Sequence, residues 1–305
     1  MTSIIPDWQW SYDGWIILVT SLVAMICAIP GSFLLVRRQA MLGDAISHAV
    51  LPGIAIGFLI SGDRGGGWML IGAIIAGLTT AVLTQFLKGI AGVDRGAALG
   101  VVFSTLFALG LLLIVQIADS VDLDPACVLY GQVELVPLDL VEFAGIEVPR
   151  VVPSLIAVLV AMSVAVGAIW KELLVASFDV ATAESQGVPA TTVNQILMTL
   201  TAAACVVAFE AVGSILVVSL LITPAAVARL ITSRFQRLMV IAALIGVVAS
   251  ILGHVAAVVG PSMLFGHDAA VSTAGMTSVM AFGILFLAML ITRFGSSRPT
   301  ERGRL

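Results

Sequence analysis

Long apolar segments separated by short polar ones follow each other along the whole chain. The longest segments without Asp, Glu, Lys or Arg include 14–36, 96–118, 238–267 and 269–292. Each exceeds the ~20 residues that a helix needs to cross the hydrocarbon core of a membrane. Because lipid offers the backbone no hydrogen-bond partner, such segments must be helical. The pattern predicts an all-α polytopic membrane protein.

About nine spans are predicted, with eight as the alternative if one of them is a half-helix that dips into the membrane. The apolar segment 192–231 is too long for a single span, at ~1.5 Å of rise per residue. We expect it to fold back within 209–213, where the sequence is FEAVG. The predicted spans are 14–35, 44–62, 67–87, 96–117, 151–170, 192–208, 212–230, 238–259 and 273–292.

The basic residues predict the orientation of these spans. Of the fourteen Lys and Arg residues, only Arg64 and Arg150 fall on one side of the nine-span topology, which leaves twelve on the other. By the positive-inside rule the N-terminus is then outside and the C-terminus cytoplasmic. With 60% hydrophobic and 10% charged residues, no stretch is polar enough to form a soluble domain. We therefore predict one transmembrane domain over 1–305, with short tails at 1–13 and 294–305.

Two non-spanning segments differ in character. Segment 118–150 is rich in Asp and Glu and falls on the outer side. Segment 171–190 falls inside and mixes apolar with polar residues before the Gly187-Val188-Pro189 break, as in a short amphipathic helix at the membrane surface. Such a helix could dock a cytoplasmic partner or could simply rest at the interface.

Asp44 and His48 are the leading candidates for chemistry. They are four residues apart, so on a helix they share a face one turn apart. A carboxylate and an imidazole at this spacing suit Mn²⁺, Fe²⁺ or Zn²⁺, which accept mixed oxygen and nitrogen ligands. In the alternative interpretation, Asp44 caps the start of the second span and His48 is an interfacial core residue.

Four further polar residues lie near the predicted outer side or at a helix break. Each could line a metal path or its mouth, or could be an ordinary polar group at a water interface. They are Glu210, His254, His267 and Asp268.

Several catalytic signatures are absent from the sequence. Neither Lys88 nor Lys171, the only lysines, lies in a GxxxxGK[ST] phosphate loop. The sequence also contains no HExxH or GxSxG motif. We expect no catalytic activity in this chain, and no ATP hydrolysis by a P-loop.

Several segments together resemble the permease subunits of the metal-type ABC importers, which take up manganese, zinc and iron in bacteria. They occur in the family's order and extend over most of the chain. The matching segments are LLVRRQAMLGDAISHAVLPGIAIGFL at 34–59, GAALGVVFSTLFALGLLL at 96–113, VLYGQVEL at 128–135, KELLVASFDVATAESQGVP at 171–189 and EAVGSILVVSLLITPAAVARLIT at 210–232.

The resemblance implies a bacterial plasma-membrane protein that works with partners. Two permease copies, identical or related, would pair. A cytoplasmic ABC ATPase would bind each copy, and an extracytoplasmic binding protein would deliver the metal. Asp44 and His48 match residues that line the family's translocation path. The coupling residues implied on the ATPase side are Ser177, Phe178, Asp179, Ala183, Gly187 and Pro189.

We therefore expect the permease of an ATP-driven importer of Mn²⁺, Zn²⁺ or Fe²⁺. It would hold no permanently bound cofactor and would have no nucleic-acid partner. The alternatives are a secondary metal/proton carrier that works alone, an ABC permease for a vitamin or siderophore, and a membrane scaffold without transport activity. The usual signs of a secondary carrier are inverted repeats and several intramembrane carboxylates, and the sequence shows no convincing repeat.

Overall fold

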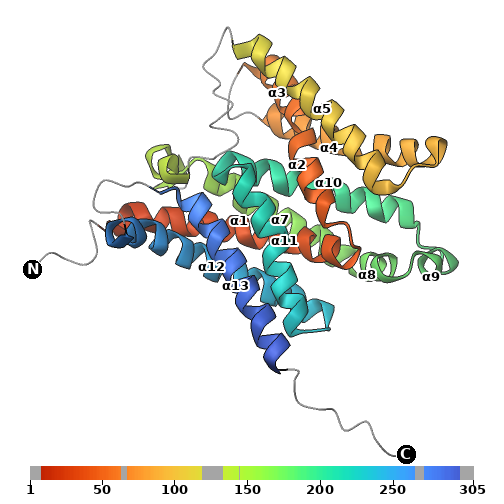
Figure 1. Cartoon of the computed structure of the whole chain (residues 1–305). Helices are drawn as coiled ribbons and strands as arrows, with labels where there is room; N and C mark the ends of the chain where they lie inside the picture. Colours follow the sequence, from red (N-terminus) through yellow and green to blue (C-terminus); the bar gives the residue numbers. More distant parts are fainter. Residues whose placement is uncertain (1–7, 63–66, 119–132, 144, 265–270, 296–305) are drawn as a thin grey trace, which may run out of the picture.

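A computed structural model describes residues 8–62, 67–118, 133–143, 145–264 and 271–295. Within these ranges the chain is almost entirely helical (Figure 1). The helices are α1 (Trp10–Val36), α2 (Ala40–Ala49), α3 (Leu51–Ser61), α4 (Gly67–Ala91), α5 (Arg95–Ala118), α7 (Val151–Ala168), α8 (Trp170–Phe178), α9 (Val180–Ser185), α10 (Ala190–Val212), α11 (Ser214–Ile231), α12 (Phe235–Leu264) and α13 (Thr273–Gly295), with the 3-10 helix η1 (Val133–Leu138).

In the part of the chain that the structure describes, eight helices have the length and hydropathy to cross a membrane. They are α1, α4, α5, α7, α10, α11, α12 and α13. The predicted fold-back within 209–213 is confirmed, because α10 ends at Val212 and α11 begins at Ser214. Gly213 between them has φ +77°, in the region that favours glycine.

The predicted span 44–62 is not one continuous helix. It is divided into α2 and α3, which meet at Val50, with Pro52 in the first turn of α3. Pro52 has no N–H to donate to the carbonyl four residues earlier, and its ring crowds that carbonyl. With eleven residues, α3 is only about 16 Å long, too short to cross a membrane alone. This segment accounts for the difference between nine predicted spans and eight long helices.

The helices form two groups joined through α2 and α10. Helices α3, α4 and α5 pack on one another, whereas α7, α10, α11 and α12 pack around α1, with α13 against α11 and α12 (Figure 1). Helix α10 contacts α4, while α2 contacts α5 on one side and α1, α10 and α11 on the other. The short helix α2 therefore lies at the junction of the two groups.

Helix α1 is the centre of the larger group, and a glycine sets its distance from α11. A Cβ built on Gly31 would lie 1.9 Å from the carbonyl oxygen of Leu221. The two backbones therefore touch, and no side chain fits between them. Near the start of the same helix, a Cβ on Gly14 would have no atom within 4 Å.

The segment predicted as an outer loop contains a structure that the all-α prediction missed. Strands β1 (Leu140–Phe143) and β2 (Ile146–Pro149) form an antiparallel hairpin in which Glu142 pairs with Glu147. Gly145 in the connection has φ +81°. A hairpin forms here because its four-residue strands need only a tight turn, for which Gly145 supplies the positive φ.

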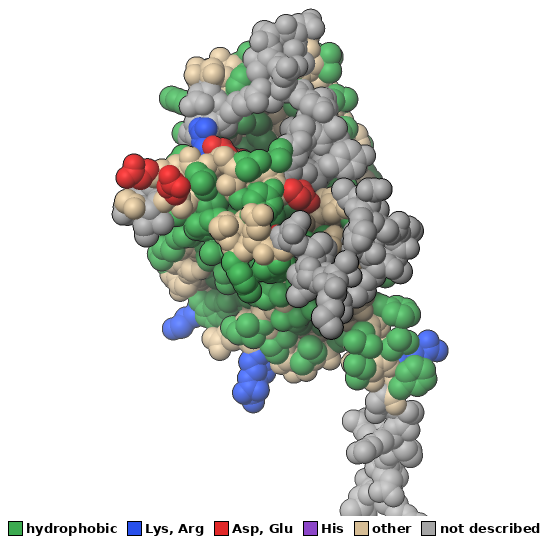
Figure 2. Space-filling view, turned by 90° about the vertical axis from the view of Figure 1, so that its left-hand side faces the viewer, with side chains coloured by type: hydrophobic (Ala, Val, Ile, Leu, Met, Phe, Trp, Pro, Cys, Tyr) green, Lys and Arg blue, Asp and Glu red, His purple; other side chains and the backbone are tan. Residues whose placement is uncertain are grey.

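Charged side chains gather at the two ends of the molecule. On the face shown in Figure 2, most Lys and Arg lie in the lower part and most Asp and Glu in the upper part, with an apolar band between them. This separation is expected of a helical bundle that crosses a membrane. An outside N-terminus remains the prediction of the positive-inside rule.

We predict that Gly31→Ala destabilises the bundle by about 1–3 kcal/mol, because the added methyl must push α1 away from α11. Gly14→Ala is the matched control on the same helix, and it should be neutral or slightly stabilising. Thermal unfolding of the two purified variants in detergent provides the measurement. Equal midpoints for both variants would contradict the close approach of α1 and α11.

Candidate functional site

Helix α2 carries both leading candidates and is held on two sides. Gly43 faces α11, where a Cβ on it would lie 2.0 Å from Cδ2 of Leu221. Toward the other end of the helix, Ala49 and the following Val50 are completely buried. Among the described side chains of α2, Gly43, Ala45 and Ala49 are buried by neighbouring helices, whereas Met41 at its start is exposed.

His48 is half-buried and packs against α5. Its ring centroid lies 5.6 Å from that of Phe103 and 5.5 Å from that of Phe107. The two phenylalanines are four residues apart, so they present adjacent rings on one face of α5. This pair fixes one side of the imidazole in an apolar surrounding.

The same face of α5 holds the break between α2 and α3. A Cβ on Gly110 would lie 2.7 Å from Cδ of Pro52 and 2.8 Å from Cβ of Leu51. The glycine therefore lets α5 approach the interrupted backbone. Positions 103, 107 and 110 share one helical face, so His48 and the break lie against the same strip of α5.

Asp44 lies one turn before His48 in α2, as the spacing predicts. Its side chain lies outside the part of the structure that is described, as do His267 and Asp268 altogether. The assignment of Asp44 and His48 as a ligand pair therefore stays a prediction. Within the described residues, no group of three or more His, Cys, Asp or Glu side chains forms a metal-binding cluster.

The remaining candidates lie away from α2. Glu210 is exposed near the C-terminal end of α10, next to the confirmed break at Gly213. His254 is only 2% exposed and lies in α12, between α1 and α13. The described hydrogen-bond partners of His254 are therefore on α1 and α13, and the described ring contacts of His48 are on α5.

A chain of buried hydrogen bonds surrounds His254. Its Nε2 lies 3.1 Å from Oδ1 of Asp13, and its Nδ1 lies 3.3 Å from the hydroxyl of Thr273. A carboxylate only accepts, so Nε2–H donates to Asp13 if that group is ionised. In a neutral imidazole, Nδ1 then accepts from Thr273. The result is a link between α1, α12 and α13.

The 3-10 helix η1 extends this link from the acidic loop. Oε1 of Glu134 accepts from the backbone N–H of Thr273 at 2.6 Å, at the start of α13, where the helix dipole favours a negative charge. The hydroxyl of Tyr12 donates to the backbone carbonyl of Glu134. We term the Asp13, Glu134, His254 and Thr273 side chains with these bonds the outer polar cluster.

At the opposite end, the predicted coupling segment is helical, as expected, but in two parts. Helices α8 and α9 are joined at Asp179, whose carboxylate accepts from the N–H of Thr182 at 3.1 Å and from its hydroxyl at 2.5 Å. Both hydrogen bonds lower the pKa of the Asp179 carboxyl, and the bond from the Thr182 hydroxyl has the larger effect. Asp179 is therefore the N-cap of α9, a role that its position before VATAES allows.

The other residues predicted to couple to an ATPase divide between the surface and the interior of this segment. Phe178 is 59% exposed, although its ring centroid lies 6.1 Å from that of Phe235. Ala183 is completely buried, whereas Gly187 and Pro189 are exposed. Gly187 has φ +79°, which lets the chain turn from α9 into α10.

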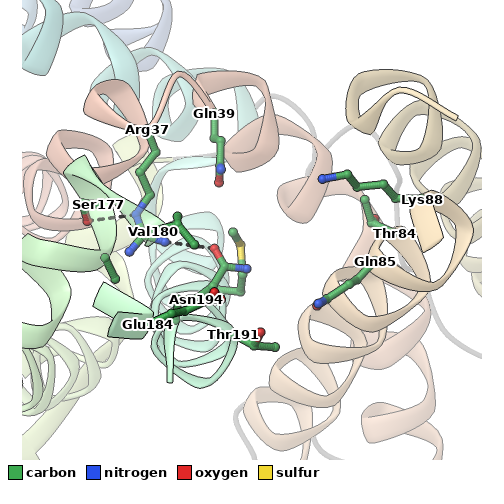
Figure 3. A pocket seen from close by; sticks show the side chains of 13 residues that line it. Arg37, Gln39, Thr84, Gln85, Lys88, Ser177, Val180, Glu184, Thr191 and Asn194 are labelled. Atoms are coloured by element: carbon green, nitrogen blue, oxygen red, sulfur yellow. Dashed lines mark hydrogen bonds between the residues drawn. The ribbon is translucent and has the colours of Figure 1, made fainter. Parts of the chain in front are cut away.

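Beside this segment lies a pocket of about 280 Å³ between α4, α8, α9 and α10. Lys88, Thr84 and Gln85 line one side, across from Arg37 and Asn194 (Figure 3). Nε of Arg37 donates to the hydroxyl of Ser177, and its Nη1 donates to Oδ1 of Asn194, each at 2.9 Å. In the sequence, Arg37 is only one of the basic residues that predict the orientation of the spans, and the Arg37-Arg38 pair carries no further signal of this contact.

Taken together, these features are those of a polytopic helical membrane protein: a helix divided at a proline, polar clusters at both ends, and a separate helical segment on the basic side. The comparisons with known proteins agree. Residues 12–293 match the family described as "ABC 3 transport family". The chain belongs to this family, whose members include metal-type permeases, and it is a multi-pass protein of the bacterial inner membrane.

Similar proteins are named for manganese and zinc. The chain is 40% identical to the manganese transport system membrane protein MntD of Bacillus subtilis, over 77% of this chain and 80% of that protein. It is 36% identical to the zinc transport system membrane protein TroD of Treponema pallidum, over 68% of this chain and 57% of that protein. The solved structure of PsaBC from Streptococcus pneumoniae in complex with Fab matches with a TM-score of 0.75 at 27% identity, over 94% of this chain and 95% of that one.

We predict that the outer polar cluster acts as a unit. His254→Ala leaves the Asp13 carboxylate buried without its imidazole partner, at a cost of roughly 3 kcal/mol. The double variant Asp13→Ala, His254→Ala should lose less than the sum of the two single variants. Denaturant unfolding of all three would show this difference. Additive losses would show that the two side chains do not interact.

A second prediction concerns the cap of α9. Asp179→Ala should speed hydrogen exchange of the Thr182 and Ala183 amides, whereas Asp179→Asn should retain most of the protection. Since the folded pKa of Asp179 is lowered, the stabilisation by its charge is present above the ordinary Asp pKa. It is lost as pH falls through the lowered folded value. Protection that is unchanged in Asp179→Ala would contradict the assigned cap.

Proposed function

We propose that this chain is the membrane-spanning permease of an ATP-driven importer of Mn²⁺, Zn²⁺ or Fe²⁺. The observation that carries the proposal is the interrupted second segment. Position 44 precedes His48 by one turn of α2, the His48 ring packs against α5, and relatives of the chain are named for manganese and zinc transport. Mixed oxygen and nitrogen donors at such a position suit these cations.

A translocation path for metal ions needs ligands that bind the ion weakly enough to release it again. One carboxylate and one imidazole from each of two permease copies would replace part of the ion's hydration shell. The rings of Phe103 and Phe107 keep the surroundings of His48 apolar, which strengthens each ion–ligand contact. We expect these two oxygen and two nitrogen donors to hold the ion only transiently as it passes.

The energy would come from a cytoplasmic ABC ATPase that docks on α8 and α9. The exposed apolar side chains of Phe178 and Val180, at 59% and 54%, offer such a partner an apolar contact next to the capped start of α9. The chain itself would then be a non-catalytic subunit. This apolar surface favours an importer with an ATPase over a carrier that works alone.

An extracytoplasmic binding protein would deliver the metal on the outer side. The hairpin and η1 belong to the acidic outer segment, and Glu134 fastens this segment to the start of α13. A docking surface that Glu134 joins to the start of α13 and, through Tyr12, to α1 can transmit the arrival of a partner to the bundle. The permease for a vitamin or siderophore remains the alternative, and the manganese and zinc relatives favour a metal ion.

We predict that Asp44→Ala combined with His48→Ala lowers metal uptake by at least about tenfold, since even groups that only orient a metal ligand are worth 10–100-fold in affinity. The measurement is uptake of radiolabelled Mn²⁺ and Zn²⁺ by cells that express the chain together with its ATPase. Asp94→Asn is the matched control, because Asp94 is an exposed carboxylate that accepts from the Gly96 amide at the start of α5.

The two parts of the proposal fail in different ways. Unchanged uptake by the double variant would overturn the ligand assignment while leaving the transport function. If cells with the unaltered chain and its ATPase accumulate no more cation than cells without them, the transport function itself is wrong.

A further inference from the structure

The guanidinium of Arg37 connects three helices at the cytoplasmic end of the bundle. Arg37 directly follows α1, Ser177 lies in α8 and Asn194 lies in α10 (Figure 3). Two different nitrogens of Arg37 make the two 2.9 Å hydrogen bonds to Ser177 and Asn194. Because the fork is planar and rigid, it fixes both the distance and the direction between the helices that it joins.

Ser177 is a well-oriented acceptor for this fork. Its hydroxyl donates to the carbonyl of Leu173 one turn earlier in α8, which leaves a lone pair for Nε of Arg37. All three side chains are half-buried, so water competes with these bonds less than it would at an exposed surface. The link therefore joins the interior of the coupling segment, rather than its exposed rim, to α1.

On its other side, Arg37 is joined to α2 by a closed turn. The N–H of Arg38 donates to the carbonyl of Leu35 at 3.0 Å, and the N–H of Gln39 donates to the carbonyl of Leu34 at 2.8 Å. With Arg38 at φ +56°, this is a Schellman end of α1. Helix α2 begins at Ala40, so only this hydrogen-bonded turn connects Arg37 to the helix that contains His48.

Apolar contacts surround the same joint without fixing its direction. The ring centroid of Phe33 lies 4.6 Å from that of Phe235 and 6.1 Å from that of Trp170. Trp170 is the first residue of α8. Such ring contacts tolerate sliding, whereas a forked hydrogen-bond pair does not. Arg37 is therefore the directional element of this junction.

We propose that Arg37 is a positioning residue that couples α8 to α2. When the ATPase displaces α8, Ser177 pulls on Arg37, and the closed turn carries the displacement to α2. Asn194 holds the same guanidinium against α10, so α2 moves relative to the α10 side of the path. This proposal rests on the proposed function, because it assumes an ATPase on α8 and a metal at α2.

The test is the number of metal ions transported per ATP hydrolysed, measured in proteoliposomes that hold the full transporter with its ATPase and Mn²⁺. Arg37→Gln should lower this ratio about tenfold, as expected when a hydrogen bond to a charged group is lost. ATP hydrolysis and the thermal midpoint should stay near those of the unaltered protein. Arg37→Lys keeps the positive charge but not the planar guanidinium with its two separate donors. Its transport ratio should therefore lie between that of Arg37→Gln and that of the unaltered protein.

Ser177→Ala removes only the acceptor and serves as the milder variant if Arg37→Gln fails to fold. Combining it with Arg37→Gln should cause no further loss, because both changes break the same bond. Arg234→Gln is the matched control, since it removes an exposed arginine from the α11–α12 connection on the same side. Its ratio should equal that of the unaltered protein.

Three outcomes would overturn the coupling role. One is an unchanged ratio in both Arg37→Gln and Ser177→Ala. Another is a parallel fall of ATP hydrolysis, thermal midpoint and transport in Arg37→Gln, which would show that Arg37 only stabilises the fold. The third is an unaltered transporter that hydrolyses ATP and moves none of Mn²⁺, Zn²⁺ and Fe²⁺, which would overturn the proposed function as well.

Discussion

The proline at the junction of α2 and α3 is the constraint on which the rest of this structure depends. Val50 keeps helical dihedral angles there, but Pro52 leaves the carbonyl four residues earlier without its helical donor. At membrane depth such a carbonyl is tolerated only where neighbouring protein or a cavity surrounds it. The chain meets this requirement by placing the break against Gly110 of α5 and by burying Ala49 and Val50 completely. A consequence is that α2, which could not cross a membrane alone, becomes an interior element between two groups of helices.

As a short helix, α2 is attached to the bundle differently from a continuous span. A continuous span would be locked by its own hydrogen bonds from one surface to the other, whereas α2 is connected by a break at one end and a closed turn at the other. The outer polar cluster and the Arg37 fork then form the polar connections at the two ends of the bundle. Between them, packing of small residues such as Gly31 keeps the helices close.

Much of the architecture could be predicted from the sequence because membrane burial leaves few choices. Charge-free segments mark the long helices, and FEAVG marks the fold-back that Gly213 makes. The same hydropathy concealed the division at Val50, since a broken apolar segment is as apolar as a continuous one. Pro52 was the local signal, but a proline near the start of a helix is compatible with either arrangement.

The site could be predicted only as far as local spacing reaches. One turn of helix relates Asp44 to His48, and a cap motif relates Asp179 to Thr182. Contacts such as Arg37 with Ser177, or Asp13 with His254, join residues more than a hundred positions apart. No periodicity records such pairs, because they depend on how the helices are packed. The hairpin was missed for another reason: its short strands are weak signals in a loop recognised mainly by charge.

The central claim is that side chains of α2 bind the metal ion on its way through the bundle. The most direct test is magnetic resonance of bound Mn²⁺. The full transporter would be labelled with ¹⁵N-histidine and loaded with Mn²⁺ while ATP hydrolysis is arrested. The account predicts a ¹⁵N hyperfine coupling to the manganese that disappears in His48→Ala and persists in His254→Ala. A coupling that survives the loss of His48, or disappears with His254 instead, would contradict it.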